Sequence, residues 1–191
     1  MFVTQGLRRI AYSPAMEARP AGMSTLGTRW ALTPHGEWRS KGFLRLREEY
    51  VELSPQRFLD WTVDGEPIRD WFASAEGERH EITWMVEGFS GEAAAAASLR
   101  ALLVDSRSSP RSDVRFGDGR VGLLYCPGCY DLACGALSAE VRVTDDTVEW
   151  RDITYQDAIA DELWAEMPRR SVTFERRAYE ATVRELLATW G

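Results

Sequence analysis

Hydrophobic and polar positions alternate in several stretches of the chain, which is the two-residue period of a half-buried β-strand. This period is clearest in residues 43–53 and 80–86, and the further strand candidates are residues 58–63, 114–116, 121–126, 136–143 and 148–155. Turn-forming residues follow three of them, at positions 64–65, 117–119 and 144–147. Because such turns connect neighbouring antiparallel strands, the pattern predicts three hairpins in a mainly antiparallel sheet.

Prolines refine the prediction for the first strands. Ser54-Pro55 is expected to end the strand that begins at residue 43, because proline has no N–H to donate to a ladder. Pro67 lies in the short return strand of the first hairpin, residues 66–68, which places that strand at the edge of the sheet. Residues 70–72 are then expected to start a short helix or a loop.

Three other stretches indicate helices. Residues 92–104 begin with alanines and continue with leucines, a composition of high helix propensity. Residues 158–167 place their apolar side chains on one helical face, and Pro168 is expected to stop this helix. Residues 179–190 carry an apolar stripe at the helical spacing, which predicts a terminal helix docked on the sheet, with Thr173 as its cap.

These elements predict an α+β fold, in which a mainly antiparallel sheet built from hairpins carries two or three helices. Residues 1–28 show no sustained period and are expected to form a loosely ordered arm. Residues 29–191 are expected to form a single domain, since nothing divides them into two. Met23 is an alternative start of translation.

Composition predicts a folded protein of the cytoplasm. Hydrophobic residues make up 45% of the chain, and its eight tryptophans supply large side chains for a core. No run of about 18 apolar residues predicts a membrane span, and the N-terminus lacks the features of a secretory signal. The three cysteines all lie within residues 126–134, unlike the dispersed cysteines of a disulfide framework, so a reducing compartment is expected.

The net charge of −7 is unevenly distributed along the chain. Residues 1–50 carry a net charge of +4 and the remainder −11, and residues 140–166 contain nine acidic groups against two arginines. This balance argues against nucleic-acid binding, which needs clustered basic residues. The acidic segment 140–166 is either a solvated face or the binding surface for a basic protein partner.

The candidate chemistry lies in one run between two predicted strands, Cys126-Pro127-Gly128-Cys129-Tyr130-Asp131-Leu132-Ala133-Cys134-Gly135. The first interpretation is a metal site, because a tight loop between strands can bring thiolates to a tetrahedral Zn²⁺ ion. Cys126, Cys129 and Cys134 would be three of the ligands. The fourth would have to come from elsewhere in the chain, from His80 or from His35.

Two other interpretations of this run remain open. Cys126 and Cys129 form a Cys-Pro-x-Cys sequence that resembles the redox motif of glutaredoxins and suggests a thiol-dependent oxidoreductase. Such a site needs a helix directly after the first cysteine, and the predicted hairpin leaves no room for one. In the third interpretation the thiols are structural, and small side chains allow a compact turn at one end of the sheet without any cofactor.

The stretch from Asp118 to Asp152, with its Cys-Pro-x-Cys-x-Asp-x-x-Cys-Gly motif, resembles a family of uncharacterised proteins of high-GC Gram-positive bacteria. Some members carry the label oxidoreductase, and the resemblance implies no known activity. It extends to residues 62–67 and to the terminal helix. The family usually has glycine after the second cysteine and often before the third, whereas this chain has Tyr130 and Ala133, a departure that argues against a tight metal knuckle.

Other catalytic templates are absent from the sequence. There is no phosphate-binding glycine-rich loop and no nucleophile elbow, and only two histidines are available as general bases. No catalytic residue is therefore predicted beyond the two cysteines of the redox alternative. The preferred hypothesis is a non-enzymatic protein-binding module, of the kind that inhibitors and immunity proteins represent.

Overall fold

The computed structural model describes residues 22–41, 47–72, 81–88, 92–103, 114–157, 159, 162–163, 165 and 167–190. Its elements, in chain order, are β1 (Leu26–Lys41), β2 (Arg47–Val63), β3 (Glu66–Pro67), the 3-10 helix η1 (Ile68–Phe72), α1 (Glu92–Leu102), β4 (Val121–Tyr125), β5 (Ala136–Val143), β6 (Thr147–Asp157), β7 (Glu162–Leu163), β8 (Arg170–Glu175) and α2 (Arg176–Trp190). None of the helices in these ranges is long and apolar enough to cross a membrane.

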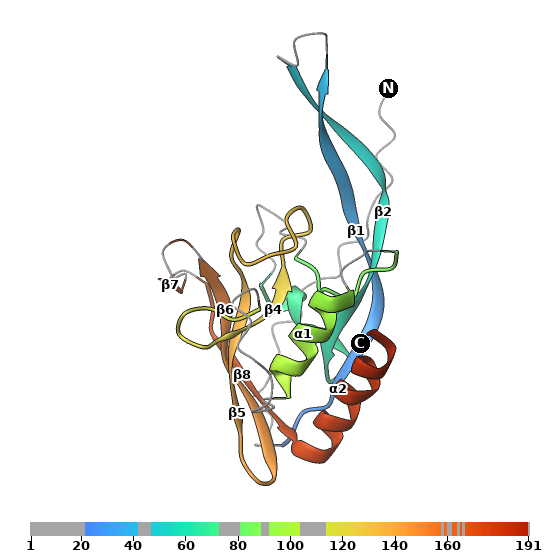
Figure 1. Cartoon of the computed structure of the whole chain (residues 1–191). Helices are drawn as coiled ribbons and strands as arrows, with labels where there is room; N and C mark the ends of the chain where they lie inside the picture. Colours follow the sequence, from blue (N-terminus) through green and yellow to red (C-terminus); the bar gives the residue numbers. More distant parts are fainter. Residues whose placement is uncertain are drawn as a thin grey trace.

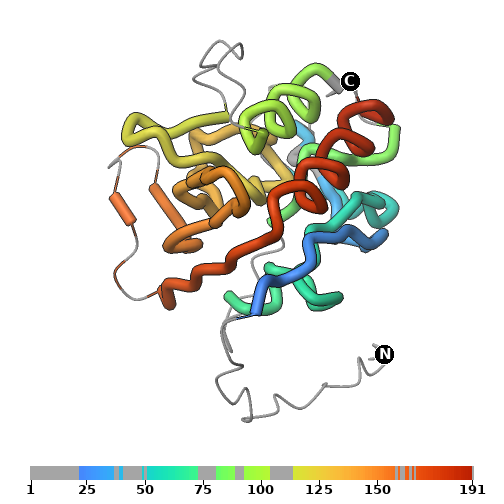
Figure 2. The backbone as a smooth tube through the Cα atoms, turned by 90° about the horizontal axis from the view of Figure 1, so that it is seen from below, coloured from blue at the N-terminus to red at the C-terminus, as the bar shows by residue number. Residues whose placement is uncertain are grey.

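The fold is α+β, with antiparallel strands in two sheets and two α-helices (Figure 1). The first sheet has the order β1-β2-β3, and the second has the order β4-β5-β6-β7 with β8 also paired to β6. Asp64 and Gly65 both have positive φ angles in the turn from β2 to β3, as the sequence predicted. The helices lie next to each other over one side of the sheets (Figure 2).

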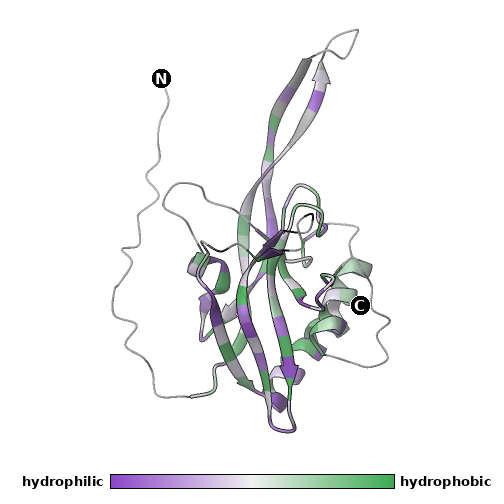
Figure 3. Cartoon of the chain, turned by 90° about the vertical axis from the view of Figure 1, so that its left-hand side faces the viewer, coloured by the Kyte–Doolittle hydropathy of each residue, from purple (hydrophilic) through white to green (hydrophobic). Residues whose placement is uncertain are grey.

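The strand that was expected to end at Ser54-Pro55 instead continues, so this prediction was wrong. The β1–β2 ladder shifts register between Thr33 and His35, and the Ser54-Pro55 dipeptide lies opposite that shift. Such a bulge leaves a residue out of the ladder and accommodates a proline within a strand. Beyond the bulge, the two strands extend past the body as a ribbon without a third strand (Figures 1 and 3).

Residues 81–86 are buried but do not form the strand that their alternation predicted. Ile82 pairs with Tyr125 of β4, whereas Val86 pairs with Phe58 of β2, each as an isolated bridge. The backbone groups of one short segment are thus divided between two sheets, which prevents a continuous ladder with either. Residues 81–88 therefore join the sheets at the point where the cysteine loop begins.

The predicted helix over residues 158–167 is also wrong. Glu162–Leu163 form β7, which pairs antiparallel with the end of β6, and Ile159 on the expected apolar face is 91% exposed. Residues 158, 160, 161, 164 and 166 lie outside the described residues. The free edge of β6 supplies hydrogen-bond partners that override the helical spacing of the apolar residues.

Both sheets and both helices contribute to one core around Trp150. Its indole ring packs edge to face on Trp61 of β2, Phe174 of β8 and Tyr179 of α2, with ring centroids 5.3–6.0 Å apart. The Trp150 Nε1–H donates a 2.9 Å hydrogen bond to the Tyr179 hydroxyl, which in turn donates to the Leu102 carbonyl of α1 at 3.2 Å. This network satisfies the buried polar atoms and ties the helices to both sheets.

The ends of the chain differ slightly from the sequence prediction. Residues 1–21 lie outside the described residues, but β1 already begins at Leu26, within the expected arm. The terminal helix was predicted correctly, with Tyr179 and Val183 buried on its apolar face. Its cap is Glu175 and not Thr173, which belongs to β8.

Candidate functional site

The cysteine loop connects the end of β4 to the start of β5. All five residues of β4 are buried, and the chain turns at Cys126 and re-enters the sheet at Ala136. No helix follows the first cysteine. The strand-loop-strand frame is the one that the sequence predicted, and it is the frame that a zinc knuckle uses.

The first half of the loop is a tight turn around Cys126. The Gly128 N–H points at the Cys126 sulfur, with N and Sγ 3.4 Å apart, and the Tyr130 N–H donates to the Cys126 carbonyl at 3.0 Å. Tyr130 has a φ angle of 54°, in the left-handed region that glycine prefers. Tyr130 therefore adopts a backbone conformation that is more usual for glycine, and the turn is closed with a tyrosine at this position.

The second half of the loop returns the chain to β5. The Asp131 carboxylate accepts a 2.8 Å hydrogen bond from the Ala133 N–H, so this side chain caps the turn. Gly135 has a φ angle of 82°, and a Cβ atom there would lie 2.5 Å from the Gln156 carbonyl oxygen. The close approach of β6 thus requires glycine directly after Cys134.

Two tyrosines anchor the loop to both sheets. The Tyr130 hydroxyl donates to the side-chain oxygen of Gln56 on β2, next to the bulge, and its ring packs against the small core cluster of Phe58, Ile82 and Val86. The Tyr155 hydroxyl of β6 donates to the Cys134 carbonyl. Sequence analysis did not identify these anchors, because each joins residues that are far apart in the chain.

The three cysteines converge as predicted. The sulfur atoms of Cys126, Cys129 and Cys134 all lie within 4.8 Å of one another. Cys126 and Cys129 are partly buried, and Cys134 is exposed. In the part of the chain that the structure describes, this is the group of three or more histidine, cysteine, aspartate or glutamate side chains arranged to hold a metal ion.

Burial raises the pKa of the Cys129 thiol above its ordinary value, and the hydrogen bonds to the neighbouring thiols of Cys134 and Cys126 act in the same direction. A redox-active cysteine needs a lowered pKa, usually from a helix N-terminus or a nearby cation. Neither a helix nor a lowered pKa occurs at Cys129. The loop thus lacks the helix that a glutaredoxin-like site needs after its first cysteine, whereas a bound metal cation would itself stabilise the thiolates.

The structure describes only one of the two histidines that were considered as a fourth metal ligand. His35 lies on β1 beside the bulge and is not part of the cysteine cluster. His80 lies outside the described residues. Ile82, which follows it by two positions, exchanges backbone hydrogen bonds with Tyr125, the residue immediately before Cys126.

The acidic segment 140–166 contributes part of the second sheet and its β5–β6 turn. Asp145 and Asp146 are exposed in this turn. Glu140 is paired with Arg142 at 2.8 Å, and this hydrogen bond lowers the pKa of the glutamate. Arg142 thus offsets one of the acidic groups. The turn also holds a positive charge, because the Arg176 guanidinium donates to the Thr144 carbonyl at 2.8 Å, and Glu162 is a further exposed acidic residue of the segment.

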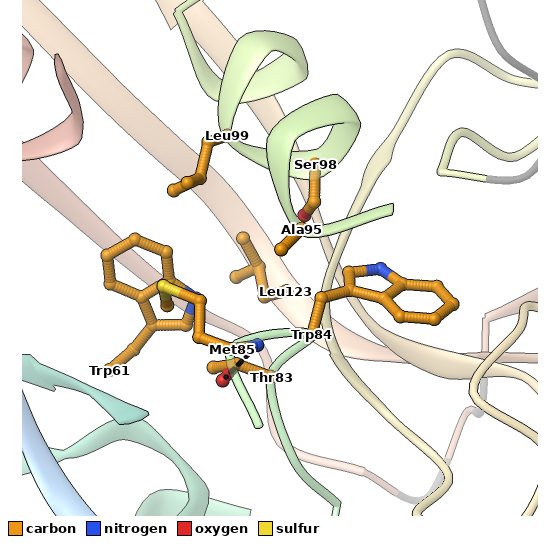
Figure 4. Close-up of a pocket in the computed structure, with 8 residues that line it drawn as sticks. All are labelled: Trp61, Thr83, Trp84, Met85, Ala95, Ser98, Leu99 and Leu123. Carbon is orange, nitrogen blue, oxygen red and sulfur yellow. Dashed lines mark hydrogen bonds between the residues drawn. The ribbon is translucent and has the colours of Figure 1, made fainter. Parts of the chain in front are cut away.

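A small hollow lies apart from the cysteine loop, between α1, β2, β4 and residues 83–85 (Figure 4). Its lining residues are Trp61, Thr83, Trp84, Met85, Ala95, Ser98, Leu99 and Leu123. The space is about that of one water molecule. The Thr83 hydroxyl donates to the Leu59 carbonyl and accepts from the Met85 N–H, so the hollow is a gap in core packing and not a substrate site.

No protein-family model, curated protein or solved structure matches the chain. The resemblance of residues 118–152 to the bacterial family therefore stays a prediction from the motif. The site must be interpreted from its own geometry and chemistry.

Proposed function

We propose that this chain is a zinc-binding protein in which Cys126, Cys129 and Cys134 hold one Zn²⁺ ion as thiolates. The observation that carries the proposal is the convergence of the three sulfur atoms within 4.8 Å. Sulfurs bound to a tetrahedral Zn²⁺ ion are about 3.8 Å apart, given Zn–S bonds of about 2.3 Å. The sulfur–sulfur distances would need to shorten by at most about 1 Å to reach this geometry.

Zinc would have a structural role at this position. The loop is already joined to β2 through Tyr130 and to β6 through Tyr155, so an ion held by its cysteines would stabilise the contact between the two sheets. The Gly128 N–H aimed at the Cys126 sulfur would support a thiolate there. The fourth ligand is proposed to be His80, whose neighbour Ile82 is paired beside the loop.

Elemental analysis of the purified full-length chain tests the proposal. We expect one zinc per chain in the natural sequence and none in a variant with all three cysteines changed to serine, with a lower melting temperature for the variant. Replacement of Zn²⁺ by Co²⁺ would give the absorption bands of thiolate coordination. A metal-free natural chain with the same stability as the serine variant would overturn the proposal.

The two histidines provide a matched pair for the fourth ligand. His80→Ala is expected to lower zinc affinity, and loss of one ligand of this type costs at least about tenfold. His35→Ala is expected to leave the affinity unchanged, because His35 does not belong to the cluster. Equal zinc affinity in the two variants would show that His80 is not a ligand, and the three cysteines would remain as the proposed ligands.

A second proposed function is binding of a basic protein partner at the acidic segment, favoured by the exposed Asp145 and Asp146 in the β5–β6 turn. Binding through this turn should weaken with salt and be lost in Asp145→Lys/Asp146→Lys. Affinity capture at two salt concentrations, with the lysine variant as control, measures this. Partners that bind both proteins equally would refute a role for the turn.

A further inference from the structure

We infer that the cysteine cluster is also a peroxide-sensitive switch, in which Cys134 is oxidised first, Cys129 then forms a disulfide with it, and the bound metal is released. The metal-release step rests on the proposed zinc site, whereas the disulfide step does not. The inference follows from the unequal exposure of the three thiols and from the convergence of their sulfur atoms within 4.8 Å.

Exposure decides which sulfur reacts first. Cys134 is the exposed member of the cluster, and its neighbour Ala133 is exposed as well. Cys126 and Cys129 are partly buried, so a small oxidant in solution meets Cys134 before it meets them. Coordination would hold this sulfur as a thiolate, which is the form that reacts with peroxide.

The arrangement of the cluster decides which thiol closes the disulfide. The sulfur atoms of Cys129 and Cys134 lie within 4.8 Å of each other, and Cys129 is nearer to Cys134 along the chain than Cys126 is. The turn between Cys129 and Cys134 is held by the Asp131 carboxylate and by the Gly135 N–H, which donates to the Leu132 carbonyl at 2.7 Å. This turn keeps Cys129 next to the oxidised sulfur.

The chemical steps balance with hydrogen peroxide as the oxidant. The Cys134 thiolate attacks one peroxide oxygen, the O–O bond breaks, and a sulfenic acid forms while the other oxygen leaves as hydroxide and takes a proton to become water. The Cys129 sulfur then attacks the Cys134 sulfur, the S–O bond breaks, and the hydroxyl leaves as a second water after protonation. The two cysteines lose two electrons in total, and the peroxide gains them.

Disulfide formation removes two of the three thiolate ligands. Cys126 alone cannot retain a zinc ion that three thiolates and a fourth ligand had held, so the metal dissociates. The backbone carbonyl of Cys134 also accepts the Tyr155 hydrogen bond, so a change at this residue is transmitted to β6. Reduction by an exchanging thiol restores the two ligands.

The experiment is a titration of the zinc-loaded full-length chain with hydrogen peroxide. A chromogenic chelator reports zinc release, and mass spectrometry after cleavage on the N-terminal side of aspartates reports the disulfide. This cleavage separates peptide 118–130, which carries Cys126 and Cys129, from peptide 131–144, which carries Cys134. A disulfide to Cys134 holds the two peptides together, whereas a disulfide between Cys126 and Cys129 does not.

Two serine variants complete the test. Cys126→Ser is expected to give the linked peptides on oxidation, and Cys134→Ser is expected to give none. Linked peptides that disappear in Cys126→Ser, or a disulfide confined to peptide 118–130, would overturn the inference. A chain purified without zinc would refute the proposed function, but the peptide analysis of the natural chain would still decide whether Cys134 and Cys129 form the disulfide.

Discussion

Asp60 on β2 is fully buried and has Arg69 as its nearest cation, with Oδ2 and Nε 2.8 Å apart. The two groups form an ion pair, although their angle is poor for a hydrogen bond. Burial raises the pKa of Asp60 from 3.8 to about 6, against the opposing effect of Arg69 and the more distant Arg29. The unfavourable desolvation of the Asp60 carboxylate is therefore larger than its favourable electrostatic interaction with the two arginines.

This pKa predicts a pH dependence of stability. The folded state holds the proton of Asp60 more tightly than the unfolded state does, so the contribution of this group is complete below about pH 3.8 and is lost as the pH rises through about 6. The loss amounts to about 3 kcal/mol in the free energy of unfolding. Asp60→Asn should flatten this part of the profile in denaturant titrations between pH 4 and 7.

Asp145 offers the control for that measurement. It is an exposed aspartate in the β5–β6 turn and is not among the charges that act on the pKa of Asp60, so the Asp145→Asn variant should keep the slope of the natural chain. Retention of the full slope in Asp60→Asn would show that another group is responsible.

At the scale of elements, α2 illustrates how a helix start is decided. Glu175 ends β8, and its carboxylate accepts hydrogen bonds from the N–H groups of Arg177 and Ala178, at 3.0 and 2.6 Å. These bonds lower the pKa of Glu175. Glutamate is not among the preferred N-cap residues, so the sequence favoured Thr173. Thr173 cannot cap the helix because it lies within β8, where it pairs with Glu149 of β6.

Removal of this cap should destabilise the chain. Glu175→Ala leaves two N–H groups at the helix start without their acceptor, and a lower melting temperature than that of the natural chain is expected at pH 7. Because the pKa of Glu175 is lowered, its stabilising effect is present above pH 4.5 and fades as the carboxylate is protonated at lower pH. The two proteins should converge in acid.

Glu185→Ala is the matched control, since this exposed glutamate lies within the same helix away from its start. A melting temperature for Glu175→Ala that equals that of the control would show that the cap contributes nothing. Thermal unfolding followed by circular dichroism at several pH values distinguishes the outcomes.

At the scale of the whole molecule, the β1–β2 ribbon and the body are built differently. The body has a core shared by both sheets and both helices, centred on Trp150. Beyond the bulge, the described residues of β1 and β2 pair in the ladder with each other and with no third strand. A two-stranded ribbon has little stability of its own, so the body supports the ribbon and not the reverse.

Deletion of the ribbon should therefore leave the body folded. Thr33 and Gln56 are directly paired, and an Asn-Gly turn between them can replace residues 34–55. The shortened chain is expected to keep its cooperative unfolding and a melting temperature no more than a few degrees below the original, since replacing these residues by a two-residue turn lowers the entropy cost of loop closure by about 2 kcal/mol. Non-cooperative unfolding or aggregation of the shortened chain would contradict this view of the molecule.

Sequence analysis found the parts of the site and fold that depend on neighbouring residues. Neighbouring residues alone indicate three of these features, which are the hairpin turn at Asp64-Gly65, the Ala-rich helix and the terminal helix with its apolar stripe. The convergence of Cys126, Cys129 and Cys134 belongs to this group, because a short loop between paired strands keeps the sulfurs close whatever the rest of the chain does.

Only the tertiary structure decided features whose partners are distant in sequence. Segment 81–88 is shared between two sheets, β7 pairs with the edge of β6, and Tyr130 reaches Gln56 on a strand more than 70 residues earlier. The alternation in residues 80–86 and the helical spacing in residues 158–167 predicted the wrong elements, because a period of apolar residues does not state which distant strand a segment pairs with. Hydrogen bonds to distant strands then outweighed the local preference, which is worth well below 1 kcal/mol per residue.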